Sequence, residues 1–184
     1  MTETKIIARP GQQYLLVGEY PMDGTVDQPQ LWLLPKPGGV DGASRLVQFM
    51  GLSIDAYEMT FARTNLLNFV PPYEGGRRTF PLVHARAAAE LILRYAVDHR
   101  LDLLILGKRG AAAFNWTTHK NNWKMPLARV GYLHWYSVCS AYDLRATRRA
   151  AIIPHTKGVN LWWNNRENME RAQRFFGQLE IHGA

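Results

Sequence analysis

Runs of apolar residues alternate along the chain with stretches in which apolar residues recur at helical spacing. Short continuous runs are typical of buried strands, and apolar positions three and four residues apart are typical of helices that cover them. An alternation of this kind predicts an α/β protein with a mostly parallel sheet between helices on both faces. The patterns predict strands over 13–17, 57–62, 101–106, 132–138 and 150–153, and helices over 42–50, 81–100 and 164–178, the last with Phe175, Phe176 and Leu179 on or near its inner face.

Two of the predicted strands end in turns that carry chemically reactive side chains. The segment LLVGEYPM at 15–22 supplies the carboxylate of Glu19, and AAIIPHTKGVNLWWN at 150–164 supplies the imidazole of His155. Because the carboxyl ends of parallel strands meet at one edge of a sheet, we expect both groups in one cleft. Long connections at 21–41 and 71–80 follow strand ends and are expected to form its rim.

Length and charge narrow the class of protein. The 184 residues, 47% of them hydrophobic, can bury a real core, and we expect one domain over 1–184. The 22 Lys and Arg residues exceed the 15 Asp and Glu residues, which gives a formal net charge of +7. A positive field attracts polyanions, so nucleic acid is the leading expected partner, and an ordinary basic protein without such a partner is the alternative.

Cysteine content and hydropathy exclude other classes. The single cysteine, Cys139, lies in a stretch predicted to be core, and it can form neither an internal disulfide nor a site of four thiolates. We therefore expect no bound metal or cofactor. The first residues lack the apolar run of a signal peptide, and no segment approaches the roughly 18 apolar residues of a membrane span. The expectation is a cytoplasmic monomer that does not bind membranes.

Three segments resemble motifs of the uracil-DNA glycosylase superfamily. GEYP at 18–21 is similar to its first motif, a Gly-Glu-x-Pro turn after the first strand. The segment 37–66 is similar to the stretch in which a Gly-rich loop leads through a helix to a strand ending in Thr-Asn, and 154–158 resembles the His-containing loop after the last strand. The resemblance covers about 15–176. It implies a three-layer αβα sandwich with a central, mostly parallel sheet of four strands.

The resemblance implies a DNA glycosylase without a covalent intermediate. Such an enzyme flips a uracil or another damaged or modified base out of single- or double-stranded DNA and hydrolyses its N-glycosidic bond. Glu19 would orient water and stabilise the positive charge that develops on the sugar, and His155 would donate a hydrogen bond to pyrimidine O2. The structural alternatives are a capping or surface carboxylate for Glu19 and a satisfied core histidine for His155.

Four further residues would bind the extruded base. Asn65 stands where the family keeps the amide that reads uracil, which accepts from N3–H and donates to O4. Trp32 or Tyr20 would supply an aromatic face, and Gly18 belongs to the first motif. The alternatives are a turn-stabilising role for Asn65 and core or lid packing for Trp32 and Tyr20.

The second motif would bind DNA through Lys157, Gly158, Val159 and Asn160. Lys157, Gly158 and the amides that follow would approach a phosphate, and Val159 or Leu161 would provide an apolar wedge. Further basic residues are either phosphate contacts or a solvated surface: Arg77, Arg78, Lys108, Arg109, Arg145, Arg148 and Arg149.

The chain departs from the family pattern at several positions. The cysteines that hold an iron–sulfur cluster in many Gly-Glu-x-Pro members are missing, Tyr20 precedes Pro21, and the second motif reads His-Thr-Lys-Gly. The excised base is therefore open among uracil, mispaired thymine, hypoxanthine and hypermodified pyrimidines, and Asp23 is a second candidate for orienting water. Two other functions remain as alternatives: nucleic-acid binding without cleavage, and an enzyme that acts on free nucleosides, nucleotides or another small ligand.

Overall fold

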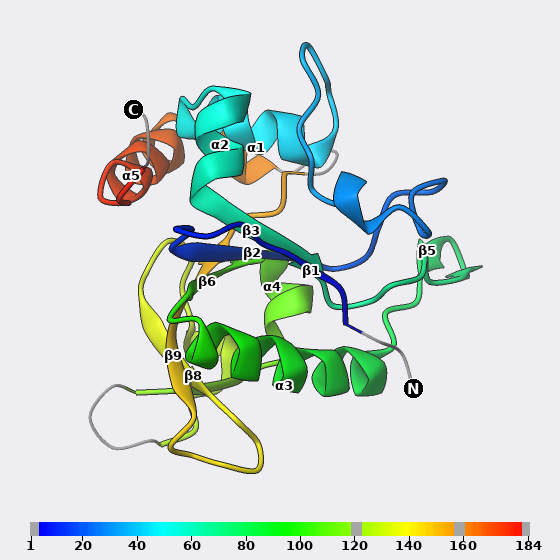
Figure 1. Ribbon diagram of the computed structural model, residues 1–184, viewed down its shortest axis with the longest axis vertical. Coiled ribbons are helices and arrows are strands. Elements are labelled where there is room, and N and C mark those ends of the chain that lie inside the picture. The colour runs from blue at the N-terminus through cyan, green and yellow to red at the C-terminus, as the bar shows by residue number, and fades with distance from the viewer. Residues whose placement is uncertain (1–3, 119–122, 157–160, 182–184) are drawn as a thin grey trace.

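The computed structural model describes residues 4–118, 123–156 and 161–181, and within them the main sheet has seven strands (Figure 1). From edge to edge the order is β1 (Ile6–Ile7), β3 (Phe61–Asn65), β2 (Tyr14–Gly18), β6 (Asp102–Leu106), β9 (Thr147–Ile153), β8 (Tyr136–Cys139) and β7 (Asn115–Thr117). A separate hairpin consists of β4 (Tyr73–Glu74) and β5 (Arg77–Arg78).

The expected sheet of four strands is wrong in number, and the reason lies at the sheet edges. The strands β3, β2, β6 and β9 do pair in parallel at the centre. Three further strands extend this core by antiparallel pairing, β1 on β3 and then β8 and β7 beyond β9. Because β1 and β7 are only two and three residues long, they leave no periodic pattern in the sequence.

Helices cover both faces of the sheet, as the alternation predicts. On one face lie α1 (Gly42–Met50), α2 (Ile54–Thr60) and α5 (Arg166–Phe176), and on the other lie α3 (Leu82–Asp98) and α4 (Gly107–Ala111) (Figure 1). Successive side chains of a strand point to opposite faces, so Leu15 and Val17 pack in the α3 core while Tyr14 and Leu16 pack in the α1 and α5 core. This arrangement is compatible with a three-layer sandwich.

The helix predicted over 42–50 is α1, and local chemistry explains its bounds. The Asp41 carboxylate accepts hydrogen bonds from the amides of Ala43 and Ser44 and so caps the first turn. Gly51 follows the last turn with a φ of 70°, a left-handed conformation that glycine adopts without strain. Two other predicted helices also form inside their expected ranges, as α3 and α5.

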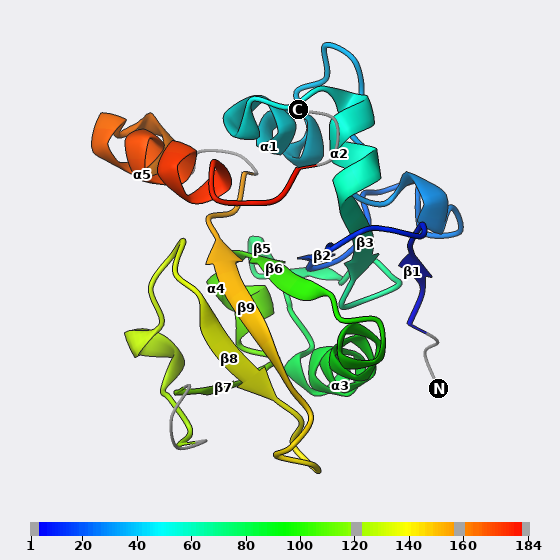
Figure 2. The ribbon, with the colours of Figure 1, turned by 60° about the vertical axis from the view of Figure 1, so that its left-hand side comes forward.

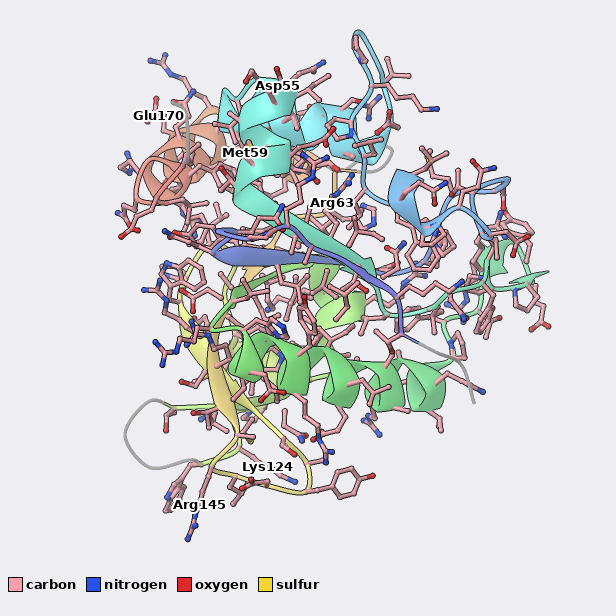
Figure 3. The ribbon with its side chains drawn as sticks, in the orientation of Figure 1. Asp55, Met59, Arg63, Lys124, Arg145 and Glu170 are labelled. Carbon is pink, nitrogen blue, oxygen red and sulfur yellow. The ribbon has the colours of Figure 1, made fainter. Side chains whose placement is uncertain are left out.

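The predicted strand over 57–62 is wrong in its first part, because residues up to Thr60 belong to α2. The Ser53 hydroxyl accepts from the amide of Ala56 and caps this helix. The apolar alternation that indicates a strand includes Met59, whose side chain is 54% exposed on the outer side of α2 (Figure 3). The strand itself, β3, runs later, from Phe61 to Asn65.

The other strand predictions differ from the structure mainly at their ends. The strand expected over 132–138 forms only from Tyr136, since Leu133 has a left-handed φ of 57° that interrupts an extended chain. Strand β9 starts at Thr147, before the expected 150, and α4 was not predicted at all. Phe175, Phe176 and Leu179 are buried, in agreement with the inner face expected for the last helix.

The elements near the carboxyl ends of the parallel strands are held together by aromatic packing. Helices α1 and α5 contact each other beyond the end of β9 (Figure 2), and the rings of Phe49 and Trp163 stack with centroids 4.2 Å apart.

Cys139 is a buried free thiol in β8. In the part of the chain that the structure describes, no helix has both the length and the apolar character needed to cross a bilayer.

Candidate functional site

A cavity of about 70 Å³ lies at the carboxyl ends of the four parallel strands. Each strand contributes a residue at its end or shortly after it: Gly18 from β2, Asn65 from β3, Leu106 from β6 and His155 after β9. The loop 20–34 and the start of α1 complete the lining. This is the edge at which α/β sheets bind their ligands.

The site residues expected from the sequence converge on this cavity wherever the structure describes them. They are Gly18, Glu19, Tyr20, Trp32, Asn65 and His155. The expected DNA contacts Lys157, Gly158, Val159 and Asn160 lie outside the described residues. The sequence-based expectation placed the acid and the imidazole in one cleft, and the structure brings them to one cavity.

Gly107 lies between the carboxylate and the imidazole. It follows β6 with a left-handed φ of 78°. A methyl group built on Gly107 would stand 3.5 Å from Glu19 Oε1 and 3.3 Å from His155 Cδ2. Both functional groups therefore lie within 3.5 Å of one point, and they face the same small space. Only a residue without a side chain fits here without strain or displacement of one of the two groups.

Glu19 is buried, with 6% of its surface exposed, and it forms an ion pair with Arg109 of α4. The Arg109 Nε donates to Glu19 Oε2 over 3.0 Å, and Nη2 donates to the same oxygen. These hydrogen bonds raise the pKa of Arg109, with burial acting in the opposite direction. The sequence placed Arg109 among possible phosphate contacts, whereas the structure turns its guanidinium toward the cavity acid.

Gly18 and Asn65 are paired in the parallel register of β2 and β3. A Cβ atom on Gly18 would stand less than 3.0 Å from Asn65 Oδ1, so glycine is needed to admit the amide. Asn65 is 3% exposed, and within the described residues its Oδ1 has no hydrogen-bond partner. A buried acceptor without a partner is costly, and at the wall of a cavity it is available to a ligand.

The two aromatic residues differ in their surroundings. Trp32 is 2% exposed, and its Nε1 donates to the carbonyl of Thr25 over 2.7 Å, so its ring is fixed in the cavity wall. Tyr20 is half-buried and its ring lies against the Arg109 guanidinium, 5.8 Å from centroid to Cζ. Both remain candidates for the face on which a planar ligand rests.

The wall next to Trp32 is held in an uncommon backbone conformation. Leu33 has a left-handed φ of 52°, and its methyl groups approach the empty side-chain position of Gly18. Its carbonyl accepts a hydrogen bond of 2.8 Å from the hydroxyl of Tyr57, which is buried beneath it. Burial raises the pKa of Tyr57, and the neutral hydroxyl therefore persists as a donor.

The segment that carries His155 is anchored on both sides. The hydroxyl of Thr156 donates to the carbonyl of Gly42 at the start of α1. Trp163 Nε1 donates to the carbonyl of His155 over 3.3 Å. These bonds fix the backbone around the imidazole relative to α1 and to the 3₁₀ turn Leu161–Asn164.

Several charged residues singled out in the sequence are engaged away from the cavity. Asp23, expected as a second group to orient water, is an exposed side chain paired with Arg78 at 2.9 Å, and it is not part of the lining. Arg148 and Arg149 both pair with Asp102. Arg78, Arg148 and Arg149 are thus held by acids of this chain.

A second, larger hollow of about 470 Å³ lies near α3 and the end of β3. Its acid, Glu90, accepts from the Ser140 hydroxyl and the Ala141 amide, and its imidazole, His84, packs edge-on against Phe69. These groups are used in internal contacts. The smaller cavity is therefore the candidate site, because its acid and imidazole converge. Asn65 lines both hollows, but its unpaired amide oxygen lies against Gly18 in the wall of the smaller one.

Sequence reasoning missed three contributors to this site. Gly107 and Gly110 on α4 pack against Glu19, and Arg109 between them supplies its counter-charge. A Gly-x-x-Gly pattern directly after the buried run 101–106 was the available signal. Across residues 4–118, 123–156 and 161–181, no group of three His, Cys, Asp or Glu side chains is placed to hold a metal ion.

The fold and site together describe an α/β protein with a small polar cavity at the carboxyl edge of its parallel strands. Comparison of the sequence with protein-family models, and with curated proteins, gives no match.

Proposed function

We propose that this protein is a DNA glycosylase, similar in fold and site to the uracil-DNA glycosylase superfamily, that hydrolyses the N-glycosidic bond of an extruded uracil or related base. One observation carries the proposal: a buried carboxylate, an imidazole and an unpaired amide oxygen line one cavity. In this interpretation the four parallel strands are the family's central sheet, and β1, β7 and β8 are additions at its edges.

The chemistry assigns a different task to each end of the cavity. As the bond from sugar to base lengthens, positive charge develops on the sugar and negative charge on the base. Glu19 stabilises the positive charge, orients the water whose oxygen bonds to the anomeric carbon, and accepts the proton that this water loses. His155 donates a hydrogen bond to O2 of the departing base, which leaves with the electron pair of the broken bond.

Asn65 gives the site its preference for uracil. Its Oδ1 accepts from N3–H, and its amide nitrogen donates to O4. Cytosine presents an acceptor at N3 and a donor at the 4-position, so it would leave the buried amide unsatisfied, which is steeply unfavourable. Tyr20 or Trp32 supports the ring, and DNA is held by Lys157, Gly158, Val159 and Asn160 as the second motif suggests.

The size of the cavity favours one ring over a whole nucleotide. Its 70 Å³ is several times the roughly 10–15 Å³ that one water molecule needs, but well below the 300 Å³ or so at which drug-sized pockets begin. This supports a flipped base whose sugar and phosphates stay outside. It speaks against an enzyme that encloses free nucleotides.

A panel of labelled oligonucleotides tests the proposal. Single- and double-stranded substrates with uracil, mispaired thymine, hypoxanthine or modified pyrimidines are incubated with the protein and then treated with alkali, which cleaves at abasic sites. We expect cleavage with uracil, a loss of about 10²- to 10³-fold for His155→Ala, and a loss of similar size for Glu19→Gln. Glu58→Gln is the matched control, because Glu58 also pairs with an arginine but lies away from the cavity.

A second candidate function is recognition of a base without cleavage. Tyr20 favours it, because a half-buried aromatic ring in the cavity lining can bind a base by stacking without any chemical step. Salt-dependent binding to uracil-containing DNA with no abasic sites on any substrate would support this candidate and contradict the glycosylase. Thermal stabilisation by a free nucleoside, with weak affinity for DNA, would contradict both.

A further inference from the structure

We propose that Arg109 is a positioning residue that supplies the counter-charge of the buried Glu19 carboxylate and directs its second oxygen into the space shared with His155. The inference rests on the proposed function and deepens it, because it concerns how the cavity acid is prepared for the reaction. The resemblance drawn from the sequence motifs assigns no role to this position.

The geometry of the ion pair orients the carboxylate. Two donors of Arg109, Nε and Nη2, bind the same oxygen, Oε2, and the third, Nη1, donates to the carbonyl of Arg78 over 3.5 Å. The other oxygen, Oε1, lies beside Gly107, on the side that His155 also faces. Glu19 is therefore held by one oxygen and presents the other, which is the arrangement needed by a group that must contact water or a sugar at a fixed point.

The surroundings hold Arg109 itself in place. Its guanidinium lies 5.8 Å from the ring centroid of Tyr20 and 5.3 Å from that of Phe80. The Cβ position of Gly110, one residue further along α4, lies 3.5 Å from Glu19 Cγ, an ordinary van der Waals distance, so helix and acid pack directly against each other. Cation–π contacts and a short helix thus preorganise the cation before any ligand arrives.

Burial explains why the acid needs this cation. A carboxylate removed from water takes up a proton more readily unless an opposite charge lies nearby. Arg109 from α4 pairs with Glu19, and His155 after β9 lies beside the same Gly107; the other polar groups of the cavity lining near Glu19 are Tyr20, next to it in the chain, and the neutral amide of Asn65 at the end of β3. Among the described residues, Arg109 is the cation that lies at ion-pair distance from the Glu19 carboxylate.

Neighbouring basic residues are directed elsewhere. Lys108 donates to the carbonyl of Leu127 and lies over the ring of Tyr132, and burial lowers the pKa of Lys108. Arg78 binds Asp23 and the carbonyl of Pro71. Neither replaces Arg109 when its charge is removed, so a substitution at Arg109 should act directly on Glu19.

A role in binding DNA phosphate is the competing interpretation of the same residue. The side chain of Arg109 is 44% exposed, which leaves part of the guanidinium accessible. The two roles differ in what they change. A phosphate contact contributes to affinity and to the salt slope of binding, whereas a positioning residue alters the pH dependence of the chemical step.

The kinetic experiment compares Arg109→Gln, Arg109→Lys and the control Arg78→Gln in single-turnover cleavage of uracil-containing DNA across acidic to alkaline pH. We expect Arg109→Gln to lose about tenfold or more at neutral pH, to shift the acid limb of its rate profile to higher pH, and to recover rate in alkali. Arg109→Lys keeps the charge and should restore part of the rate. Arg78→Gln should resemble the unaltered protein, because the Arg78 side chain pairs with the exposed Asp23, and its contact with Arg109 is made by the backbone carbonyl, which the substitution keeps.

A second measurement works without activity. The carboxyl carbon of Glu19, followed by NMR in glutamate-labelled protein and assigned through Glu19→Gln, should titrate at higher pH in Arg109→Gln than in the unaltered protein. An unchanged titration of Glu19 in folded Arg109→Gln would overturn the inference. The inference would also be overturned if Arg109→Gln bound DNA more weakly with a reduced salt slope while the pH dependence of its cleavage rate stayed the same. A shifted titration in a protein that cleaves no substrate would uphold the role of Arg109 and reject the glycosylase.

Discussion

Two glycines at the cavity matter because their missing side chains leave space for neighbouring functional groups. Gly18 admits the Asn65 amide, and Gly107 separates Glu19 from His155. Neither requirement could be derived from the sequence, because the identity of the neighbouring group depends on which strands pair. The reactive residues could be predicted, since a carboxylate and an imidazole at strand ends are visible in the chain itself.

We predict that Gly18→Ala loses recognition of the base. The new methyl group displaces Asn65 Oδ1, because its position is less than 3.0 Å from that atom, and overpacking of this kind costs about 1–3 kcal/mol of stability. The measurement is the ratio of cleavage or binding for uracil against cytosine, together with urea unfolding.

Gly24→Ala is the matched control for that substitution. Gly24 has a left-handed φ of 81° and an open side-chain position, so alanine there adds backbone strain of about 1–2 kcal/mol without touching Asn65. Equal loss of base discrimination in both variants would show that the effect comes from general destabilisation and would contradict the role assigned to Gly18.

The buried hydroxyl of Tyr57 leads us to predict that the folded protein loses stability at alkaline pH. Its pKa is raised in the folded protein by burial, so above the ordinary pKa of about 10 the unfolded chain releases a proton that the native chain retains. Stability is then full below that pH and falls above it by up to about 1.4 kcal/mol per pH unit. Tyr57→Phe should remove this slope in urea unfolding and cost about 1 kcal/mol at neutral pH, through the lost bond to Leu33.

The exposed Tyr142 provides the comparison for Tyr57. Tyr142→Phe removes a phenol from the same chain without disturbing the cavity wall. If Tyr57→Phe kept the full alkaline slope, the buried hydroxyl would not be its source.

At the scale of elements, the sequence was most informative where local signals agree. The helix at 42–50 combines apolar spacing with an acid before it and a glycine after it, and it forms with those bounds. The segment 57–62 combines conflicting signals, since its alternation favours a strand while Ser53 caps a helix that runs to Thr60. Short elements such as β1, β7 and α4 depend on neighbours across the sheet, which no local pattern contains.

The cap of α1 also shapes the site, and this gives an element-scale prediction. Asp41 lines the cavity and accepts from two amides and from the Ser44 hydroxyl. Asp41→Ala should cost about 1 kcal/mol of stability in urea unfolding and also weaken binding of uracil-containing DNA. Asp41→Asn should lose less stability, because asparagine is an equally good cap.

Ser53→Ala separates the two effects. Ser53 caps α2 and does not line the cavity, so its loss should lower stability by a similar amount and leave DNA binding unchanged. If Ser53→Ala weakened DNA binding as much as Asp41→Ala, the effect would be one of stability and not of cavity shape.

For the whole molecule, the parallel core and its covering helices follow from the alternation of apolar runs, and the net charge of +7 points to a polyanion. Where a polyanion would bind could not be predicted from charge, because several of the arginines considered as DNA contacts pair with acids of the chain. The ion pair of Glu19 with Arg109 was equally hidden, since the two residues meet only through the adjacency of β2 and β6.

Salt dependence gives the prediction at this scale. Binding of DNA should weaken about tenfold between roughly 50 and 200 mM salt for every two phosphate contacts. Lys157→Gln should reduce the slope of log K against log salt by about one. Arg145→Gln should not, because Arg145 lies in the loop before β9, at the opposite end of that strand from the cavity (Figure 3). A slope reduced by Arg145→Gln alone would place the DNA at the other end of the molecule.

The contribution of one residue from each parallel strand to the cavity has a consequence for dissection of the protein. A fragment cut before β9 would retain Glu19 and Asn65 but lack His155. Two separately produced fragments, a long one that ends and a short one that begins in the exposed turn between β8 and β9, should therefore lack the proposed activity alone and regain it only on reassembly, which would make this chain suitable for a split reporter of association.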